Sequence, residues 1–194
     1  MNTEQPEGPP KLEKPKKDKK DKKKKASRTT ETLFRSLMSN HIQLSTLADR
    51  KANLMISVNA IVLSVVATLL LREVRVLPIL IWPTVVLMVV CLLTITFAVL
   101  ATKPSLGPAK ADPDQFDLLF FGDYTALSAD EYQLAMQTLL QDETRLHDSL
   151  IANIYAQGTT LKLKYKRLKT AYTLFMYGFP VAIILFLVVY LTGL

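Results

Sequence analysis

The chain has 194 residues, which is room for about one domain. Hydrophobic residues make up 49% of it, and the formal net charge is +7. Residues 1–28 contain ten lysines, one arginine and five acidic residues, a net charge of +6, so the rest of the chain is close to neutral. The single cysteine, Cys91, excludes an intrachain disulfide and a thiolate metal cluster.

The N-terminal segment, residues 1–28, is of low complexity, with prolines followed by a lysine-rich run through Lys25. Because such a segment buries too little apolar surface to offset its ordering entropy, we expect a disordered basic tail. Two interpretations stay open: a solvated tail that helps to fix topology, or a tail attracted to anionic lipid by roughly 1 kcal/mol per basic residue near the surface. The tail has no interleaved aromatic residues for base stacking, so we expect no nucleic-acid partner.

A helix is predicted to begin at Thr29. Leu33, Leu37 and Leu44 fall on one stripe at helical spacing, and His41 interrupts this stripe with a polar side chain. Residues 27–71 contain no proline or glycine, so we expect this amphipathic helix to continue into the first apolar segment. Residues 29–194 are therefore expected to form the folded domain.

Three segments without charge predict membrane spans. They are Ala52–Leu71, Leu77–Thr102 and Thr170–Leu194, with 20, 26 and 25 residues. A transmembrane helix needs roughly 20 mainly apolar residues, so we place the spans at about 52–71, 79–101 and 171–193. The first segment is too long for a signal peptide and has no Ala-x-Ala cleavage pattern, which predicts a retained anchor. The fold class is an all-α integral membrane protein with three transmembrane helices, a helical cytoplasmic extension and a disordered basic N-terminal tail.

The region between the second and third spans, residues 102–170, is predicted to be a proline-containing linker followed by helices. Ser128 and Glu131 have the spacing of a capping box, and Asp142 is a candidate cap for a long helix that continues into the third span. That helix carries apolar residues at heptad-like steps. They are Leu150, Ile154, Leu161, Tyr165, Leu168 and Tyr172. We expect this seam to pack on the first long helix, within or between chains, which predicts a homo-oligomer as one outcome.

The distribution of basic residues predicts the orientation. The tail, Arg50, Lys51, Lys103 and the cluster at 162–169 fall on one side of the membrane, whereas only Arg72 and Arg75 fall on the other. The positive-inside rule therefore puts the N-terminus and the helical region in the cytoplasm. Three spans then put the C-terminus on the outer side of the membrane, which is the periplasmic side if the membrane is a bacterial inner membrane.

Catalytic and metal-binding patterns are absent from the sequence. It has no phosphate-binding glycine loop, no nucleophile elbow and no zinc-ligand spacing. His147 and Asp148 form an HD dipeptide, but the chain has only two histidines, too few for a metal-dependent phosphohydrolase. We therefore expect no enzyme activity, no metal and no cofactor.

Polar residues at the first span allow two interpretations each. Arg50 and Lys51, where the helix enters the bilayer, are interfacial anchors or contacts for a phosphate. Asn59 and Ser64, within the span, either join helices by hydrogen bonds or line a polar pore.

An aromatic cluster, residues 120–124, lies in the region between the spans. Its rings either dock onto the helices or form a base-stacking platform beside the basic cluster that contains Lys164 and Arg167. The same basic residues are also typical of the cytoplasmic end of a membrane span.

These features together resemble the transmembrane effector family of Pycsar, the pyrimidine cyclase system for antiphage resistance. The shared pieces are Ala48-Asp49-Arg50-Lys51-Ala52 before a span with Asn59, then Phe120-Phe121-Gly122-Asp123 and the capped helix, and finally Leu161-x-x-Lys164-Tyr165-x-x-Leu168-x-x-Ala171-Tyr172-x-x-Phe175-x-x-Gly178. They cover roughly residues 33–190.

The resemblance implies a bacterial inner-membrane effector that a cyclic pyrimidine nucleotide, cyclic UMP (cUMP) or cyclic CMP (cCMP), activates. The effector then impairs the membrane and causes abortive infection, and a pyrimidine nucleotide cyclase is its functional partner. The chain has no β-roll nucleotide module, so the ligand would bind to the helical part. The hypothetical ligand contacts are Arg50, Lys51, Phe121, Tyr124, Lys164 and Arg167. Two alternatives stay open: activation by a cyclic oligonucleotide, or a passive membrane anchor that recruits a cytoplasmic protein.

Overall fold

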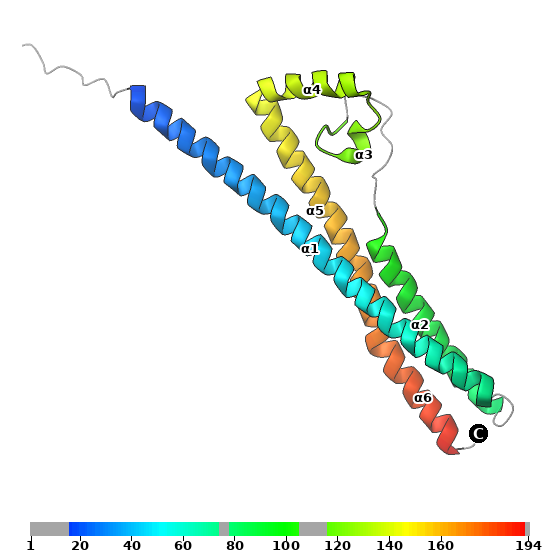
Figure 1. The fold of residues 1–194 in the computed structure, drawn as a ribbon. Coiled ribbons are helices and arrows are strands. Elements are labelled where there is room, and N and C mark those ends of the chain that lie inside the picture. Colours follow the sequence, from blue (N-terminus) through cyan, green and yellow to red (C-terminus); the bar gives the residue numbers. More distant parts are fainter. Residues whose placement is uncertain (1–15, 74–77, 105–115, 193–194) are drawn as a thin grey trace, which may run out of the picture. The chain divides into compact units, whose positions relative to one another are not determined.

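The fold is given by a computed structural model that describes residues 16–73, 78–104 and 116–192 (Figure 1). Its helices are α1 (Lys16–Glu73), the 3-10 turn η1 (Pro78–Leu80), α2 (Ile81–Thr102), α3 (Phe121–Tyr124), α4 (Ala129–Gln141), α5 (Glu143–Thr173), the π-helical turn η3 (Leu174–Gly178) and α6 (Phe179–Thr192). These described residues form no strand. The all-α prediction is confirmed.

The chain divides into two units, Met1–Leu37 and Met38–Leu194. In the first unit, α1 begins at Lys16 and not at the expected Thr29. The helix therefore begins N-terminal of the expected position, and residues 1–15 of the expected tail lie outside the described residues. The physical reason is local: Pro15 is the last proline of the segment, and the lysine-rich sequence that follows it consists mainly of good helix formers. The second unit contains everything described below.

Three helical segments are long and apolar enough to cross a membrane: Ser27–Leu71, Pro78–Thr102 and Glu143–Thr192. They contain the expected spans 52–71 and 79–101 and all described residues of the span expected at 171–193, which confirms the three-span prediction. The expected loop between the first two spans falls largely on residues 74–77, outside the described residues.

The third span changes its helical geometry just before a proline. Residues Leu174–Gly178 form the π-helical turn η3, and α6 begins at Phe179 with Pro180 in its first turn. Proline has no N–H and its ring clashes with the carbonyl group four residues earlier in a regular α-helix. Pro180 lies in the first turn of α6, where a proline is tolerated because the first N–H groups of a helix have no partner within it.

Small residues pack the three spans together. Ala48, Ala52, Ala98, Ala101 and Ala171, from α1, α2 and α5, are buried in one cluster. Met55 and Leu168 complete this cluster. A second cluster joins α2 and α6 through buried Leu87, Cys91 and Ala182, with half-buried residues of α1 against it. Alanine lets helix backbones approach closely, which is how helices associate in lipid, where water exclusion gives no driving force.

The seam expected on the last long helix is partly realised. Leu168 is 4% exposed and packs against α1 and α2 within the chain, and Tyr165 lies half-buried against the same cluster. Tyr172 is exposed, however, so the stripe turns away from the core near the membrane. A straight α-helix rotates relative to a strict heptad repeat, which explains why the end of the stripe leaves the interface.

Helix caps fix the part of the second unit that lies outside the spans. The Ser128 N–H donates to Glu131 Oε2 at 2.8 Å, and the Glu131 N–H donates back to Ser128 Oγ at 3.3 Å, which confirms the capping box. The Ser128 hydroxyl also donates to Glu131, and these bonds to the side chain and backbone of Ser128 lower the pKa of Glu131. Asp142 caps α5 by accepting from the N–H groups of Thr144 and Arg145.

Candidate functional site

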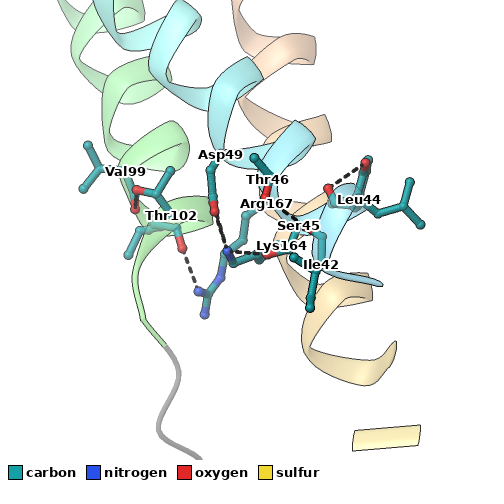
Figure 2. A network of polar contacts seen from close by, with 11 residues as sticks. Ile42, Leu44, Ser45, Thr46, Asp49, Val99, Thr102, Lys164 and Arg167 are labelled. Atoms are coloured by element: carbon teal, nitrogen blue, oxygen red, sulfur yellow. Dashed lines mark hydrogen bonds and ion pairs between the residues drawn. The ribbon is translucent and has the colours of Figure 1, made fainter. Parts of the chain in front are cut away.

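Lys164 is the centre of a polar network between α1 and α5 (Figure 2). Its Nζ donates to Asp49 Oδ1 and Oδ2 at 2.9 and 3.0 Å and to Ser45 Oγ at 3.0 Å. The Lys164 side chain is 18% exposed and that of Asp49 is 38% exposed. These three contacts use the donor capacity of the ammonium group, so an anionic ligand that binds Lys164 must replace one of these acceptors.

Two other side chains of α5, near Lys164, form hydrogen bonds to backbone carbonyls of α1 and α2. Arg167 Nη1 donates to the Leu100 carbonyl at 2.8 Å, and Tyr165 Oη donates to the Leu44 carbonyl at 3.2 Å. Leu100 lies in the last turn of α2, where carbonyls have no partner within the helix. Arg167 therefore satisfies a helix end and adds a favourable charge to its dipole, which is a structural role.

A cavity of about 540 Å³ lies beyond this network, between α1, the segment at residues 117–123 and α5. Its polar lining includes His41, Ser45, Asp117, Asn153, Gln157 and Lys164. Apolar lining comes from Ile42, Phe120, Ala156 and Leu161. A cavity of this size, with one aromatic residue and a few convergent polar groups, is typical of a small-molecule site.

A chain of amides forms one wall of the cavity. Asn153 Nδ2 donates to Asp117 Oδ2 at 2.8 Å, and Gln157 Nε2 donates to Asn153 Oδ1 at 2.7 Å. Because the Asp117 carboxylate only accepts, Asn153 must present its NH₂ group to Asp117. Its Oδ1 then faces Gln157, which must present its own NH₂ group to Asn153. Gln157 therefore keeps its Oε1 and its second N–H for another partner.

The carboxylates on this wall accept hydrogen bonds from backbone N–H groups. Asp117 Oδ1 accepts from the Leu119 N–H at 2.9 Å, and the buried Asp123 accepts from the Asp117 N–H at 2.9 Å. These bonds hold the segment before α3 in shape. Lys164 is the one cationic side chain among the described lining residues, beside the carboxylates of Asp117 and Asp123. His41 Nδ1 is buried and has no hydrogen-bond partner among the described residues. The cavity lining is thus not fully satisfied by the described residues alone.

The six expected ligand contacts do not form one group. Lys164 lines the cavity, whereas Arg167 is bound to the end of α2. Arg50 and Lys51 are exposed, and Phe121 is 54% exposed. Arg50, Lys51 and Phe121 do not line the cavity. Tyr124 does not line it either, and its ring packs in a tilted arrangement against Tyr132, with 4.8 Å between the ring centroids.

The two polar residues of the first span differ in position. Asn59 is fully buried, and its Nδ2 donates to the Met55 carbonyl at 2.8 Å, one turn earlier in the same helix. Its Oδ1 has no partner among the described residues. Ser64 is exposed on the outside of the helices, so the two residues do not share one polar surface in a single chain.

Chemically, the cavity can bind a small anion with a polar, flat group attached. Lys164 supplies one positive charge, the Ser45 hydroxyl keeps a hydrogen to donate, and Gln157 offers a donor and an acceptor side by side. No group of three metal-ligating residues occurs in the part of the chain that the structure describes.

Sequence reasoning missed most of this lining. One signal was available: Asn153, Gln157 and Lys164 follow steps of four and seven residues, which place them on one polar stripe of α5 beside the apolar seam. His41 was visible as the polar interruption of the first stripe. The pairing of Asn153 with Asp117 was not visible, since 36 residues separate them.

Comparison with known proteins adds one finding. A family model described as the Pycsar effector protein domain matches residues 32–192. The matched range includes the three spans, the Lys164 network and the cavity. No curated protein and no solved structure matches the chain.

Proposed function

Because the chain belongs to the Pycsar effector family and is a membrane protein with three transmembrane helices, we propose that a cyclic pyrimidine nucleotide, cUMP or cCMP, activates it to impair membrane integrity. Family membership makes the chain a defence effector and links it to a cyclase and a cyclic nucleotide. The proposal adds the class of base, the membrane damage and the abortive infection that follows. It also makes the action non-enzymatic.

The observation that carries the proposal is the cavity with a single cationic side chain among its described lining residues. A cyclic mononucleotide has one phosphodiester charge, and Lys164 is the matching group among the described lining residues. A cyclic oligonucleotide has two or more such charges and would leave at least one without a cation. The geometry therefore favours the mononucleotide over the oligonucleotide. A passive anchor would need no polar cavity at all.

The inner membrane and an orientation with a cytoplasmic N-terminus are part of the same proposal. The basic residues of the tail and of α5 support it by the positive-inside rule, and the cavity then faces the compartment in which a cyclase releases its product. In a variant without Cys91, a cysteine at Arg75 should react with a membrane-impermeant reagent in intact spheroplasts, and a cysteine at Ser128 should react only after lysis. Labelling at Ser128 before lysis would refute this orientation.

Homo-oligomers are proposed as the damaging species. Within one chain the spans are joined by buried alanines, with no polar channel between them among the described residues. Membrane damage by such a bundle requires several copies or a change in how the helices meet the lipid. Of the six ligand contacts proposed from the sequence, which also include Arg50, Lys51, Phe121, Tyr124 and Arg167, Lys164 is the one that lines the cavity.

The experiment is expression in bacteria together with a uridylate or cytidylate cyclase. Cells with the active cyclase should lose membrane potential, as followed by a potential-sensitive dye, and cells with a catalytically dead cyclase should not. A loss of potential that is the same with both cyclases would contradict activation by the nucleotide.

A further inference from the structure

We infer that the cavity between α1, residues 117–123 and α5 is the nucleotide site, with Lys164 and Ser45 for the cyclic phosphate and Gln157 for the edge of the pyrimidine. This inference rests on the proposed function and places its ligand. Neither Gln157 nor Ser45 was among the contacts expected from the sequence.

The spacing of Gln157 and Lys164 along α5 matches the distance between the base and the phosphate of one nucleotide. Gln157 and Lys164 both line the cavity and are seven residues apart. At 1.5 Å per residue this is about 10 Å, two turns of helix, which is the scale of one nucleotide. The apolar residues Ile42, Phe120 and Leu161 line the same cavity and supply surface for a ribose and a flat base.

Hydrogen-bond chemistry matches the base end. Asp117 fixes the amide of Asn153, which in turn fixes Gln157, so the free Oε1 and N–H of Gln157 are held in place by the fold. The Watson–Crick edges of uracil and of cytosine each offer a donor next to an acceptor. A primary amide offers the complementary pair, so one side chain can bind either base.

The phosphate end contains a replaceable partner. Lys164 contacts Asp49, which is 38% exposed and does not line the cavity, and Ser45, which does. A cyclic phosphate in the cavity takes the place of the Asp49 carboxylate on Lys164, and Asp49 then turns to water. Ser45 accepts from Lys164, so its hydroxyl hydrogen is free to donate to a phosphate oxygen.

This exchange predicts opposite effects for the two members of the ion pair. Lys164→Met removes the cation and should weaken binding about ten- to a hundredfold, the range for a charge-assisted hydrogen bond. Asp49→Asn removes the competitor and keeps the lysine, so it should bind about three- to tenfold more tightly than the parent. A pair with only a structural role predicts that neither change strengthens binding.

The test is calorimetry with cUMP and with cCMP on the full-length protein in detergent. Gln157→Leu should weaken binding about two- to tenfold, as expected for neutral hydrogen bonds. Exposed residues outside the cavity give matched controls: Lys166→Met on α5 and Gln137→Leu on α4 should leave the affinity unchanged. Helicity and elution volume in detergent verify that each variant is folded.

The outcomes separate the inference from the function. Parent protein that binds neither nucleotide would overturn the proposed activation and this site with it. Parent protein that binds, with Lys164→Met and Gln157→Leu as tight as the controls, would overturn the cavity assignment alone. Weaker binding in both variants, together with tighter binding by Asp49→Asn, is the result that the geometry predicts.

Discussion

Gly178 lies where the third span contacts α2, and Val90 of α2 leaves no room for a side chain at this position. A Cβ atom at this position would be 2.8 Å from Val90 Cγ1 and 3.2 Å from Val90 Cγ2. Valine is β-branched and keeps one strongly preferred χ1 rotamer in a helix, so its methyl groups do not swing aside. Gly178→Ala must therefore push α2 and the third span apart.

The magnitude follows from two opposing terms. Overpacking of this kind destabilises by about 1–3 kcal/mol. Alanine gains about 1 kcal/mol of helix propensity over glycine, so the net loss should be about 0–2 kcal/mol. Equilibrium unfolding in mixed detergent and SDS micelles, followed by helicity, measures it. Val90→Ala removes both methyl groups, and the double variant should lose less stability than the two single losses added together, by about 1 kcal/mol.

Gly158→Ala is the matched control. A Cβ atom there would meet only His41 Cε1, at 3.7 Å, an ordinary van der Waals contact. This variant should be as stable as the parent or up to about 1 kcal/mol more stable, because only the propensity term acts. Equal losses for the two glycine variants, or strict additivity with Val90→Ala, would refute the argument from close packing.

Three further predictions concern stability. The bonds to Ser128 lower the pKa of Glu131, so the capping box is formed above the ordinary glutamate pKa and is lost as the pH falls through the lowered pKa. The secondary chemical shifts of the first turn of α4 should follow this loss. Ser128→Ala should remove this pH dependence. Asn59→Leu removes a buried acceptor that has no partner among the described residues, at the loss of the bond from Nδ2 to the Met55 carbonyl. Stability in micelles should stay constant or rise by about 1 kcal/mol, and a drop of about 1 kcal/mol or more would contradict this reasoning. Leu168→Glu puts a charge into the buried cluster between α1, α2 and α5 and should destabilise the protein by about 3 kcal/mol or more. Lys162→Glu changes an exposed residue of the same helix and should change stability by less than about 0.5 kcal/mol. Equal effects in the same unfolding assay would contradict the burial of Leu168 between these helices.

Span positions could be predicted from the sequence because they depend on a local property. A run of about 20 residues without charge is sufficient, and Ala52–Leu71 is such a run. The capping box at Ser128 was predictable for the same reason, since both partners lie within one turn. The start of α1 was missed because composition favoured disorder, while the stretch after Pro15 has good helix formers.

The cavity could not be predicted, because it depends on contacts between distant segments. The sequence identified cations near the membrane as phosphate contacts, yet Arg167 is occupied by the Leu100 carbonyl and Lys164 by Asp49. Which cation still faces a cavity is decided by how α1 and α5 cross. The polar stripe of Asn153 and Gln157 was visible, but not that Asp117 would orient it.

The most direct test of the account is dye release from liposomes that contain only the purified protein. Addition of cUMP or cCMP should release the dye from vesicles with the parent protein, at a midpoint close to the dissociation constant from calorimetry. Vesicles with Lys164→Met should need about ten- to a hundredfold more nucleotide. No release by the parent at saturating cUMP and cCMP, with the protein shown to be inserted and nucleotide-bound, would contradict the claim that the nucleotide turns this protein against the membrane.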